Sequence, residues 1–284
     1  MSTATTYAPG EKTHRDENFP VASFLIAKPF RAAVMAFYRF ARATDDIADN
    51  PQLAPEEKIR QLDQFEATLL GQSDAETEAM PLREACTKYA ITPRHGQDLL
   101  IAFRQDATKL RYENWDELVH YCMFSAAPVG RFVLEVHGEL SDTWKASDDI
   151  CSALQIINHL QDCRADYQRF NRIYLPRDAM EKHGVSEAML VAEKATPQLR
   201  ACLAELTART KTMMDGAKLS GTIRDLRLAI EIETIERLAH ALLALLAARD
   251  PLSERVHLSK GNMLAITLRA ALAVVVRRIV SVDK

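Results

Sequence analysis

Two pairs of aspartates share one spacing and could bind a divalent metal ion. Asp45 and Asp49 lie in FARATDDIADN, and Asp162 and Asp166 lie in NHLQDCRADYQ. A separation of four residues places both carboxylates of a pair on one face of a helix, about 6 Å apart along its axis. Carboxylate oxygens are the ligands that Mg²⁺ prefers. The spacing therefore indicates two acidic metal-binding faces.

Both pairs occupy an unfavourable position in their predicted helices. Aspartate is a poor helix former, and the last turn of a helix carries partial negative charge, which costs about 0.3–1 kcal/mol per acidic side chain. Asn50-Pro51 ends the first helix directly after its pair, and the stretch leading to Pro176 ends the second. We expect a positive group near each pair to offset this cost.

Two solvated acidic faces would be the simplest alternative to metal binding. Residues 30–50 are apolar on nearly every side, however, which is typical of a buried helix. A buried carboxylate must be paired or bound to metal. Each pair also continues a polar stripe along its helix, formed by Tyr38, Arg42, Asp45 and Asp49 in the first and by Gln155, Asn158, Asp162 and Asp166 in the second. These features favour metal binding.

A third acidic pair, Asp148-Asp149, has a purely structural interpretation. It follows Ser147 and precedes the apolar run that contains Ile150 and Leu154. Acidic residues at the start of a helix cap free N–H groups and complement the helix dipole. We therefore predict a helix N-terminus here and no chemistry.

Composition excludes several classes of protein. The chain has 284 residues, a net charge of −3 and no dense basic patch, so nucleic acid is not an expected partner. Its five cysteines follow no disulfide or zinc spacing and fit the reducing cytosol. The N-terminal stretch has no apolar core like that of a signal peptide, so we expect a flexible tail over residues 1–15 and a cytoplasmic protein.

The remaining chain, residues 16–284, reads as one all-α domain. Apolar periodicity predicts helices near 30–49, 55–71, 80–90, 95–109, 115–139, 146–168, 197–218, 222–248 and 259–282. Pro128 should kink the helix predicted over 115–139. The small residues around it, such as Ser125 and Gly130, leave space either for close helix packing or for a ligand.

The most apolar stretch, residues 263–280, is interrupted by Arg269 and by Arg277-Arg278. It is slightly short and too charged for a membrane-spanning helix, which favours a buried or surface-lying C-terminal helix. Peripheral contact with the inner face of the membrane is therefore left open.

Two long segments resemble the signatures of the squalene and phytoene synthase family. They are FPVASFLIAKPFRAAVMAFYRFARATDDIADN and LQIINHLQDCRADYQRFNRIYLP, and the likeness runs from about Phe19 to Arg255. The sequence motif NHLQDC resembles the hydroxysqualene synthases of bacterial hopanoid biosynthesis more than it resembles the phytoene synthases.

The resemblance implies an isoprenoid-synthase α-fold in which helices surround a deep apolar cavity with Mg²⁺ at its mouth. It implies metal binding by Asp45, Asp49, Asn158, Asp162 and Asp166, and catalytic roles for Tyr121, Asp45 and Asp162. It implies substrate binding by Phe19, Tyr38, Arg42, Gln155, Asn158 and Arg255. Alternatively, Arg42 has no contact with substrate and forms an ion pair with Asp45 or Asp46. An aromatic wall would suit a carbocation, and Phe19, Phe24, Phe37 and Phe124 are candidates, although each also fits a core position.

Two departures from the family pattern bear on the reaction. Gln161 stands where phytoene synthases usually have arginine before the second pair, and Tyr167 replaces a further acid. Compared with that arginine, Gln161 leaves one positive charge fewer near a bound diphosphate. This favours a reaction in which presqualene diphosphate is ionised and water quenches the cation to give hydroxysqualene. No NADPH is expected for that reaction. The alternative is head-to-head condensation of two farnesyl diphosphates. Either role implies a functional link to other squalene-pathway enzymes.

Two other functional classes remain as alternatives. Glu117-x-x-His120 and Glu254-x-x-His257 match the ligand spacing of a carboxylate-bridged di-metal helical oxidase. The second match lies beside Pro251 in a turn-like stretch, which weakens this hypothesis. A non-catalytic helical scaffold is the other alternative, but a scaffold would have no reason to keep four unfavourably placed carboxylates.

Overall fold

The computed structural model describes residues 25–282 and is built from α-helices. Within that range the only strand-like pairing is an isolated bridge between Arg111 and Ile173. The helices are α1 (Lys28–Ala48), α2 (Pro55–Leu69), α3 (Met80–Tyr89), α4 (Arg94–Asp106), α5 (Trp115–Ser125), α6 (Ala127–Val136), α7 (Trp144–Phe170), α8 (Arg177–Lys182), α9 (Pro197–Gly216), α10 (Leu226–Ala248) and α11 (Lys260–Val282), with short 3-10 helices η1 (Ser141–Thr143) and η2 (Glu187–Val191). The expected all-α class is confirmed.

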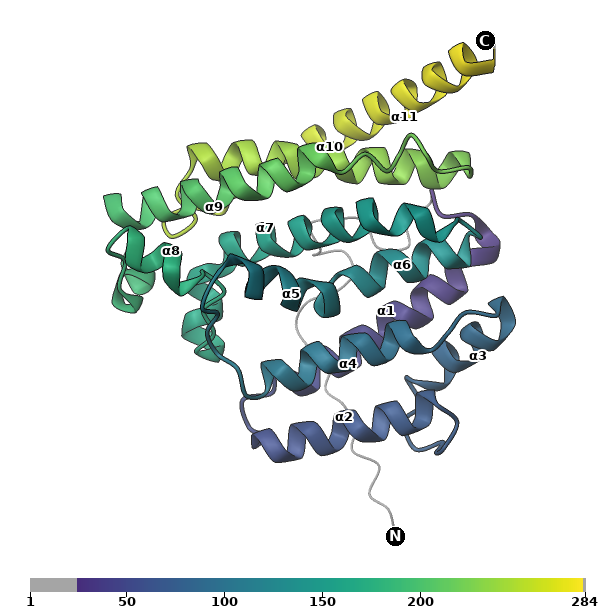
Figure 1. Cartoon of the computed structure of the whole chain (residues 1–284), viewed down its shortest axis with the longest axis horizontal. Coiled ribbons are helices and arrows are strands. Elements are labelled where there is room, and N and C mark those ends of the chain that lie inside the picture. Colours follow the sequence, from purple (N-terminus) through teal and green to yellow (C-terminus); the bar gives the residue numbers. More distant parts are fainter. Residues whose placement is uncertain (1–24, 283–284) are drawn as a thin grey trace.

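The helices pack around two apolar clusters. One cluster joins α1 to α2, α3 and α4, with Phe40 and Phe65 among its fully buried residues. The other joins α5 and α7 to α9 and α10. Figure 1 shows α1–α4 in the lower part of the molecule and α9 and α10 along its upper edge, with α5, α6 and α7 between them. Helices α1 and α7, which carry the two aspartate pairs, therefore belong to different clusters.

The first predicted helix is buried as expected, because α1 packs against α2, α3, α4 and α6. Most predicted bounds lie within a few residues of the observed ones. Sequence periodicity missed α8 and the two 3-10 helices, which are too short to show a clear apolar repeat.

The predicted kink at Pro128 is a complete break between α5 and α6. Ala126 has φ −128° and ψ −46°, outside helical values, and Pro128 occupies the first turn of α6. Proline is tolerated there because its missing N–H would have no partner within the helix. The chain therefore changes direction at Ala126.

At Gly130, the small residue serves close helix packing and not ligand binding. A Cβ atom at this position would lie 2.3 Å from Ser147 Oγ and 2.7 Å from Cys151 Sγ, both on α7. Glycine thus allows α6 and α7 to pack closely. Ser125, at the end of α5, instead lines the cavity described below.

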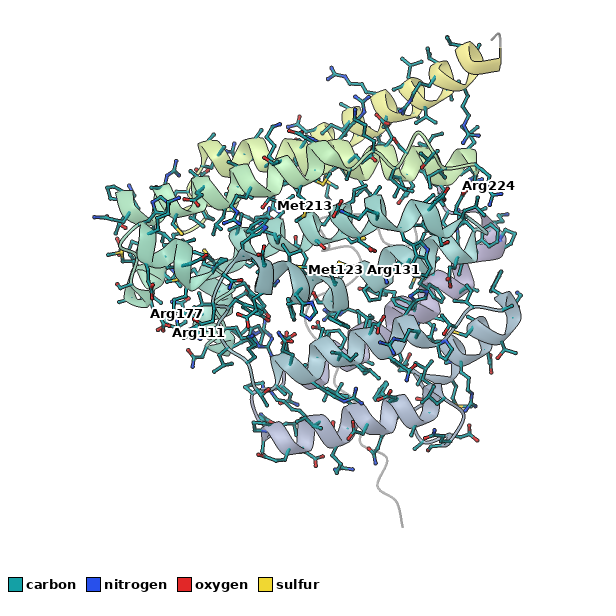
Figure 2. The ribbon with its side chains drawn as sticks, viewed as in Figure 1. Arg111, Met123, Arg131, Arg177, Met213 and Arg224 are labelled. Atoms are coloured by element: carbon teal, nitrogen blue, oxygen red, sulfur yellow. The ribbon has the colours of Figure 1, made fainter. Side chains whose placement is uncertain are left out.

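The N-terminal capping role predicted for Asp148-Asp149 is wrong. Helix α7 begins at Trp144, so both residues lie in its second turn. Asp148 is buried and accepts a hydrogen bond of 2.8 Å from Arg131 Nε on α6, a residue labelled in Figure 2. Both residues are structural, as expected, but Asp148 joins α7 to α6, and Asp149 pairs with Lys145 on α7 itself.

Helix α11 lies on the surface. It packs one side against α10, where Ala270 and Val274 are buried, and leaves its other side exposed. None of the helices between residues 25 and 282 is long and apolar enough to cross a membrane.

Candidate active site

Both aspartate pairs line one cavity of about 880 Å³. Its walls come from α1, α4, α5 and α7, from the chain that follows α7, and from the segment 251–257 between α10 and α11. The sequence-predicted site residues on this cavity are Tyr38, Arg42, Asp45, Asp49, Tyr121, Gln155, Asn158, Asp162, Asp166 and Arg255. Phe19 lies outside the described residues. The structure therefore brings together side chains from both signature segments and from two other parts of the chain.

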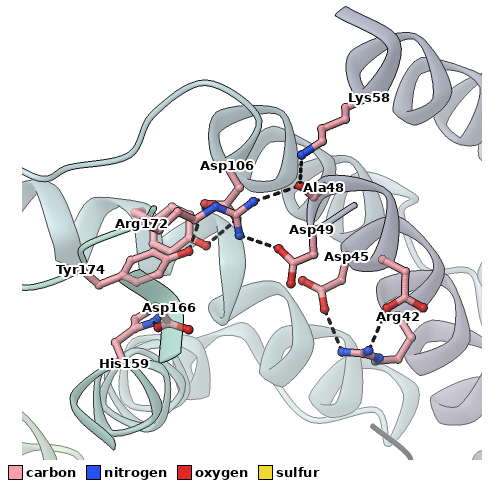
Figure 3. A network of polar contacts seen from close by, with 12 residues as sticks. Arg42, Asp45, Ala48, Asp49, Lys58, Asp106, His159, Asp166, Arg172 and Tyr174 are labelled. Atoms are coloured by element: carbon pink, nitrogen blue, oxygen red, sulfur yellow. Dashed lines mark hydrogen bonds and ion pairs between the residues drawn. The ribbon is translucent and has the colours of Figure 1, made fainter. Parts of the chain in front are cut away.

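Positive groups neutralise the C-terminal end of α1, as its acidic residues require. Arg172, which follows α7, donates from Nη1 to Asp49 Oδ1 at 2.5 Å and from Nη2 to the Ala48 carbonyl at 3.0 Å. Lys58 of α2 donates to the same carbonyl at 2.7 Å. Figure 3 shows these groups converging on the last turn of α1. Two cations from distant segments thus stabilise the partial negative charge of this helix end.

Arg42 is held by its own helix. It donates to Asp45 Oδ2 at 2.8 Å and to Asp46 Oδ1 at 2.9 Å, and it also lines the cavity. The predicted pairing with acidic neighbours is therefore present, and it orients the guanidinium beside the cavity.

Asp45 has a strongly perturbed carboxyl group. It lies deep in the cavity, although about a third (32%) of its side chain is exposed there. Burial, followed by the nearby charge of Asp49, raises its pKa to about 8 in the protein without bound cations, and Arg42 opposes the shift. A like-charged pair of this kind provides a strong site for a cation.

Asp106, at the end of α4, is a buried acid that sequence analysis missed. It accepts hydrogen bonds from Tyr121 Oη at 2.8 Å and from Tyr174 Oη at 3.4 Å. Burial raises its pKa to about 6, while Arg172 acts in the opposite direction. Burial and the nearby Asp106 also raise the pKa values of Tyr121 and Tyr174 well above their usual range, so both phenols stay neutral.

Aromatic rings form one wall of the cavity. The rings of Tyr121 and Tyr174 lie 5.7 Å apart, and the imidazole of His159 stacks on Tyr174 at 3.5 Å and 14°. The expected wall residues differ: Phe37 stacks on Phe132 in the α1 cluster, and Phe124 packs against the other cluster. Neither lines the cavity. Phe24, like Phe19, lies outside the described residues. The sequence shows that these residues are phenylalanines, but it does not show whether each one lies in the core or on the cavity wall.

The second aspartate pair faces the first from α7. His159 Nδ1 lies 3.6 Å from Asp166 Oδ2. Gln161, directly before Asp162, points to the segment 251–257, where its Nε2 donates to the Val256 carbonyl at 2.5 Å. Arg164 donates to the Leu252 carbonyl at 2.9 Å. These two bonds hold the segment that carries Arg255 along α7.

The donor set fits magnesium shared with a ligand. Among residues 25–282 no three His, Cys, Asp or Glu side chains converge closely enough to hold a metal by themselves. Mg²⁺ usually takes only one or two carboxylates and completes its octahedron with water and substrate phosphate oxygens. Asp45 and Asp49 on one wall, with Asp162 and Asp166 on the other, provide that kind of partial coordination.

The ligand set of a di-metal oxidase does not form. Glu254 and His257 line the cavity but lie in a non-helical segment. Glu117 pairs with Lys109, and neither Glu117 nor His120 reaches the cavity. The two Glu-x-x-His matches are therefore far from the inward-facing arrangement that such an oxidase requires.

Comparisons with known proteins agree with this geometry. Residues 12–262 match the family model described as squalene/phytoene synthase. Hydroxysqualene synthase of Rhodopseudomonas palustris is 48% identical over 98% of this chain and 95% of its own length. The enzyme of the same name from Sinorhizobium fredii is 50% identical over 88% of this chain and 86% of its own length.

Solved structures show the same architecture. Squalene synthase HpnC from Alicyclobacillus acidocaldarius superposes with a TM-score of 0.70 at 29% identity, covering 79% of this chain and 85% of that one. A ligand complex of a dehydrosqualene synthase gives a TM-score of 0.77 at 21% identity over 89% of this chain and 90% of that one. The fold is the all-α isoprenoid-synthase fold, and the chain is an enzyme of the squalene/phytoene synthase family.

Proposed function

We propose that this enzyme ionises presqualene diphosphate in the presence of Mg²⁺ and adds water to the rearranged cation, giving hydroxysqualene and diphosphate. The placement of both aspartate pairs on one cavity carries the proposal, because it creates a site for cations that bind a diphosphate. The names of the relatives that are 45–50% identical support the choice of reaction.

The proposed site residues divide into those that hold the diphosphate and those that face the hydrocarbon. Asp45, Asp49, Asp162 and Asp166, together with Asn158, would hold Mg²⁺, which supplies charge neutralisation for the leaving group when it is bound. Arg42 and Arg255 line the same cavity and can donate to phosphate oxygens.

The reaction begins when the C–O bond to diphosphate breaks and its electron pair leaves with the diphosphate. The cyclopropylcarbinyl cation that remains then rearranges. Tyr121 lies on the cavity wall with its hydroxyl hydrogen donated to Asp106, and its phenol stays neutral. A neutral ring face stabilises a nearby cation without trapping it. Tyr121 would therefore protect the cation during its rearrangement.

Water completes the reaction. Its oxygen forms the new C–O bond to the cation, and the proton it loses passes to the released diphosphate, a base formed in the same step as the cation. No reductant is needed, because the cation is captured by water rather than by hydride. NADPH is accordingly not part of the proposed reaction.

Gln161 supports ionisation of presqualene diphosphate over the condensation of two farnesyl diphosphates. The side-chain amide is neutral, so this position adds no positive charge to the cavity, and its Nε2 donates to the Val256 carbonyl. Product analysis tests the choice. Purified enzyme with Mg²⁺ and presqualene diphosphate should release hydroxysqualene without NADPH, whereas conversion of farnesyl diphosphate alone to presqualene diphosphate would assign the earlier step.

A further inference from the structure

Helix α11 exposes a continuous apolar stripe. The leucines Leu264, Leu268 and Leu272 are 61%, 63% and 65% exposed, and Ile279 is 59% exposed. Steps of four and seven residues keep these side chains on one face of the helix. Single exposed hydrophobic residues are ordinary, but a contiguous patch on a monomer marks a contact surface. Figure 1 shows α11 running beside α10 and then extending beyond it toward the C-terminus.

The body of the protein fixes the direction of this stripe. The opposite side of α11 buries Ala270 and Val274 against the core. Near the C-terminal end of the helix, Arg277 pairs with Glu233 of α10, and Arg278 donates to the Ile223 and Arg224 carbonyls at 2.8 Å each. The leucine stripe therefore faces outward because the other side of the helix is bound.

The charges of α11 identify what the stripe contacts. The helix sequence KGNMLAITLRAALAVVVRRIVSV contains one lysine and three arginines and no acidic residue. Helical spacing places Arg269 on one flank of the leucine stripe and Lys260 on the other. Lys260 and Arg269 are both exposed. An apolar face bordered by cations suits an anionic lipid surface, where the apolar side chains enter the boundary and the cations meet the headgroups.

A second copy of the chain fits this surface less well. Pairing two α11 helices through their leucine stripes would set cations beside cations, because the helix carries Lys260, Arg269, Arg277 and Arg278 and no acid to compensate them. Charge complementarity thus favours lipid over self-association.

We propose that α11 docks on the surface of an anionic membrane with Leu264, Leu268 and Leu272 in the lipid boundary. The helix would lie on the membrane, since no helix of the described part of the chain can span one. The segment 251–257, which lines the cavity, leads directly into α11 at Lys260. Docking would therefore place one wall of the cavity close to lipid. This inference goes beyond the proposed reaction and holds whichever diphosphate is used.

Sedimentation of the full chain with lipid vesicles tests the proposal without any substrate. Wild-type protein should bind phosphatidylcholine vesicles that contain phosphatidylglycerol. The double variant Leu268→Ser/Leu272→Ser should lower the partition coefficient by about tenfold or more, because two apolar side chains are lost from the boundary. Lys260→Gln/Arg269→Gln should lower it by about tenfold on these vesicles and have little effect on pure phosphatidylcholine.

Leu70→Ser is the matched control, because Leu70 is 38% exposed and directly follows α2, which lies at the opposite end of the molecule from α11 (Figure 1). It should bind vesicles like the wild type, and circular dichroism should show that all variants are folded. Wild-type protein that does not sediment with anionic vesicles, or a Leu268/Leu272 variant that sediments equally well, would overturn the proposal. So would light scattering that shows a wild-type dimer that the leucine variant converts to monomer, because the stripe would then be a self-association surface.

Discussion

Arg172 Nη1 lies 2.5 Å from Asp49 Oδ1, although 123 residues separate the two in the chain. The same guanidinium donates to the Ala48 carbonyl, so one side chain binds both the acidic side chain and the backbone at the end of α1. Arg172 lies two residues after the end of α7, within the second signature segment. This contact therefore joins the ends of the two signature segments at the cavity.

Replacing Arg172 should destabilise the fold. The Arg172→Gln change leaves Asp49 without its buried charged partner and removes the bond to Ala48, and such a loss costs about 3 kcal/mol. Urea unfolding measures the difference. Arg60→Gln is the control, because Arg60 forms an exposed pair with Glu57 on α2 and its loss should leave the midpoint unchanged. Equal midpoints for Arg172→Gln and the wild type would show that the contact adds no stability.

The two aspartate pairs should be required for turnover and not for folding. Asp45→Asn and Asp162→Asn each remove a proposed Mg²⁺ ligand while keeping the shape of the side chain, so we expect the rate to fall by about a hundredfold or more. Asp149→Asn provides a control from the structural pair, because Asp149 pairs only with Lys145 on α7. Steady-state rates and circular dichroism distinguish the variants. Full activity in Asp45→Asn would refute the metal-binding role of α1.

Asp106 should make stability depend on pH. Its pKa rises from 3.8 to about 6 on folding, so the folded protein binds a proton more tightly than the unfolded chain. The stability from this group is present below the unfolded pKa and is lost as the pH rises through about 6. From about pH 5 to about pH 7, wild type should therefore lose on the order of 1 kcal/mol relative to Asp106→Asn. Urea unfolding of both proteins at the two pH values measures this, and parallel pH dependence would contradict it.

Gln161 should hold the segment 251–257 in place. The Gln161→Ala change removes the bond to the Val256 carbonyl, and the segment that carries Arg255 should become more mobile. We expect faster hydrogen exchange over 251–257 and a KM raised by about tenfold, the equivalent of one lost buried hydrogen bond. Gln72→Ala, at an exposed position after α2, should change neither value. Unchanged exchange over 251–257 in Gln161→Ala would show that the bond does not restrain the segment.

The acidic part of the site could be predicted because helical spacing fixes which side chains share a face. Asp45 and Asp49 depend only on the geometry of α1, and Asp162 and Asp166 only on that of α7. Their common cavity was an expectation from the family resemblance, and the structure places them there. The need for a positive group at the end of α1 also followed from elementary electrostatics.

Partners that meet through tertiary packing could not be predicted. Arg172 follows the end of α7, and no local pattern shows that it reaches Asp49 across the cavity. Asp106 lies at the end of α4 without a second acid at helical spacing, so nothing in the sequence marks it as a partner of Tyr121. Asp148 was misassigned for a related reason, since its partner Arg131 lies on another helix.

The source of the product oxygen tests the proposed reaction most directly. Purified enzyme, Mg²⁺ and presqualene diphosphate should be incubated in water enriched in oxygen-18 without NADPH, and the product analysed by mass spectrometry. We predict hydroxysqualene that carries one labelled oxygen, because water captures the cation. Unlabelled hydroxysqualene would contradict the water-capture step. If the enzyme gave no product from presqualene diphosphate but consumed farnesyl diphosphate, the proposed function itself would be contradicted.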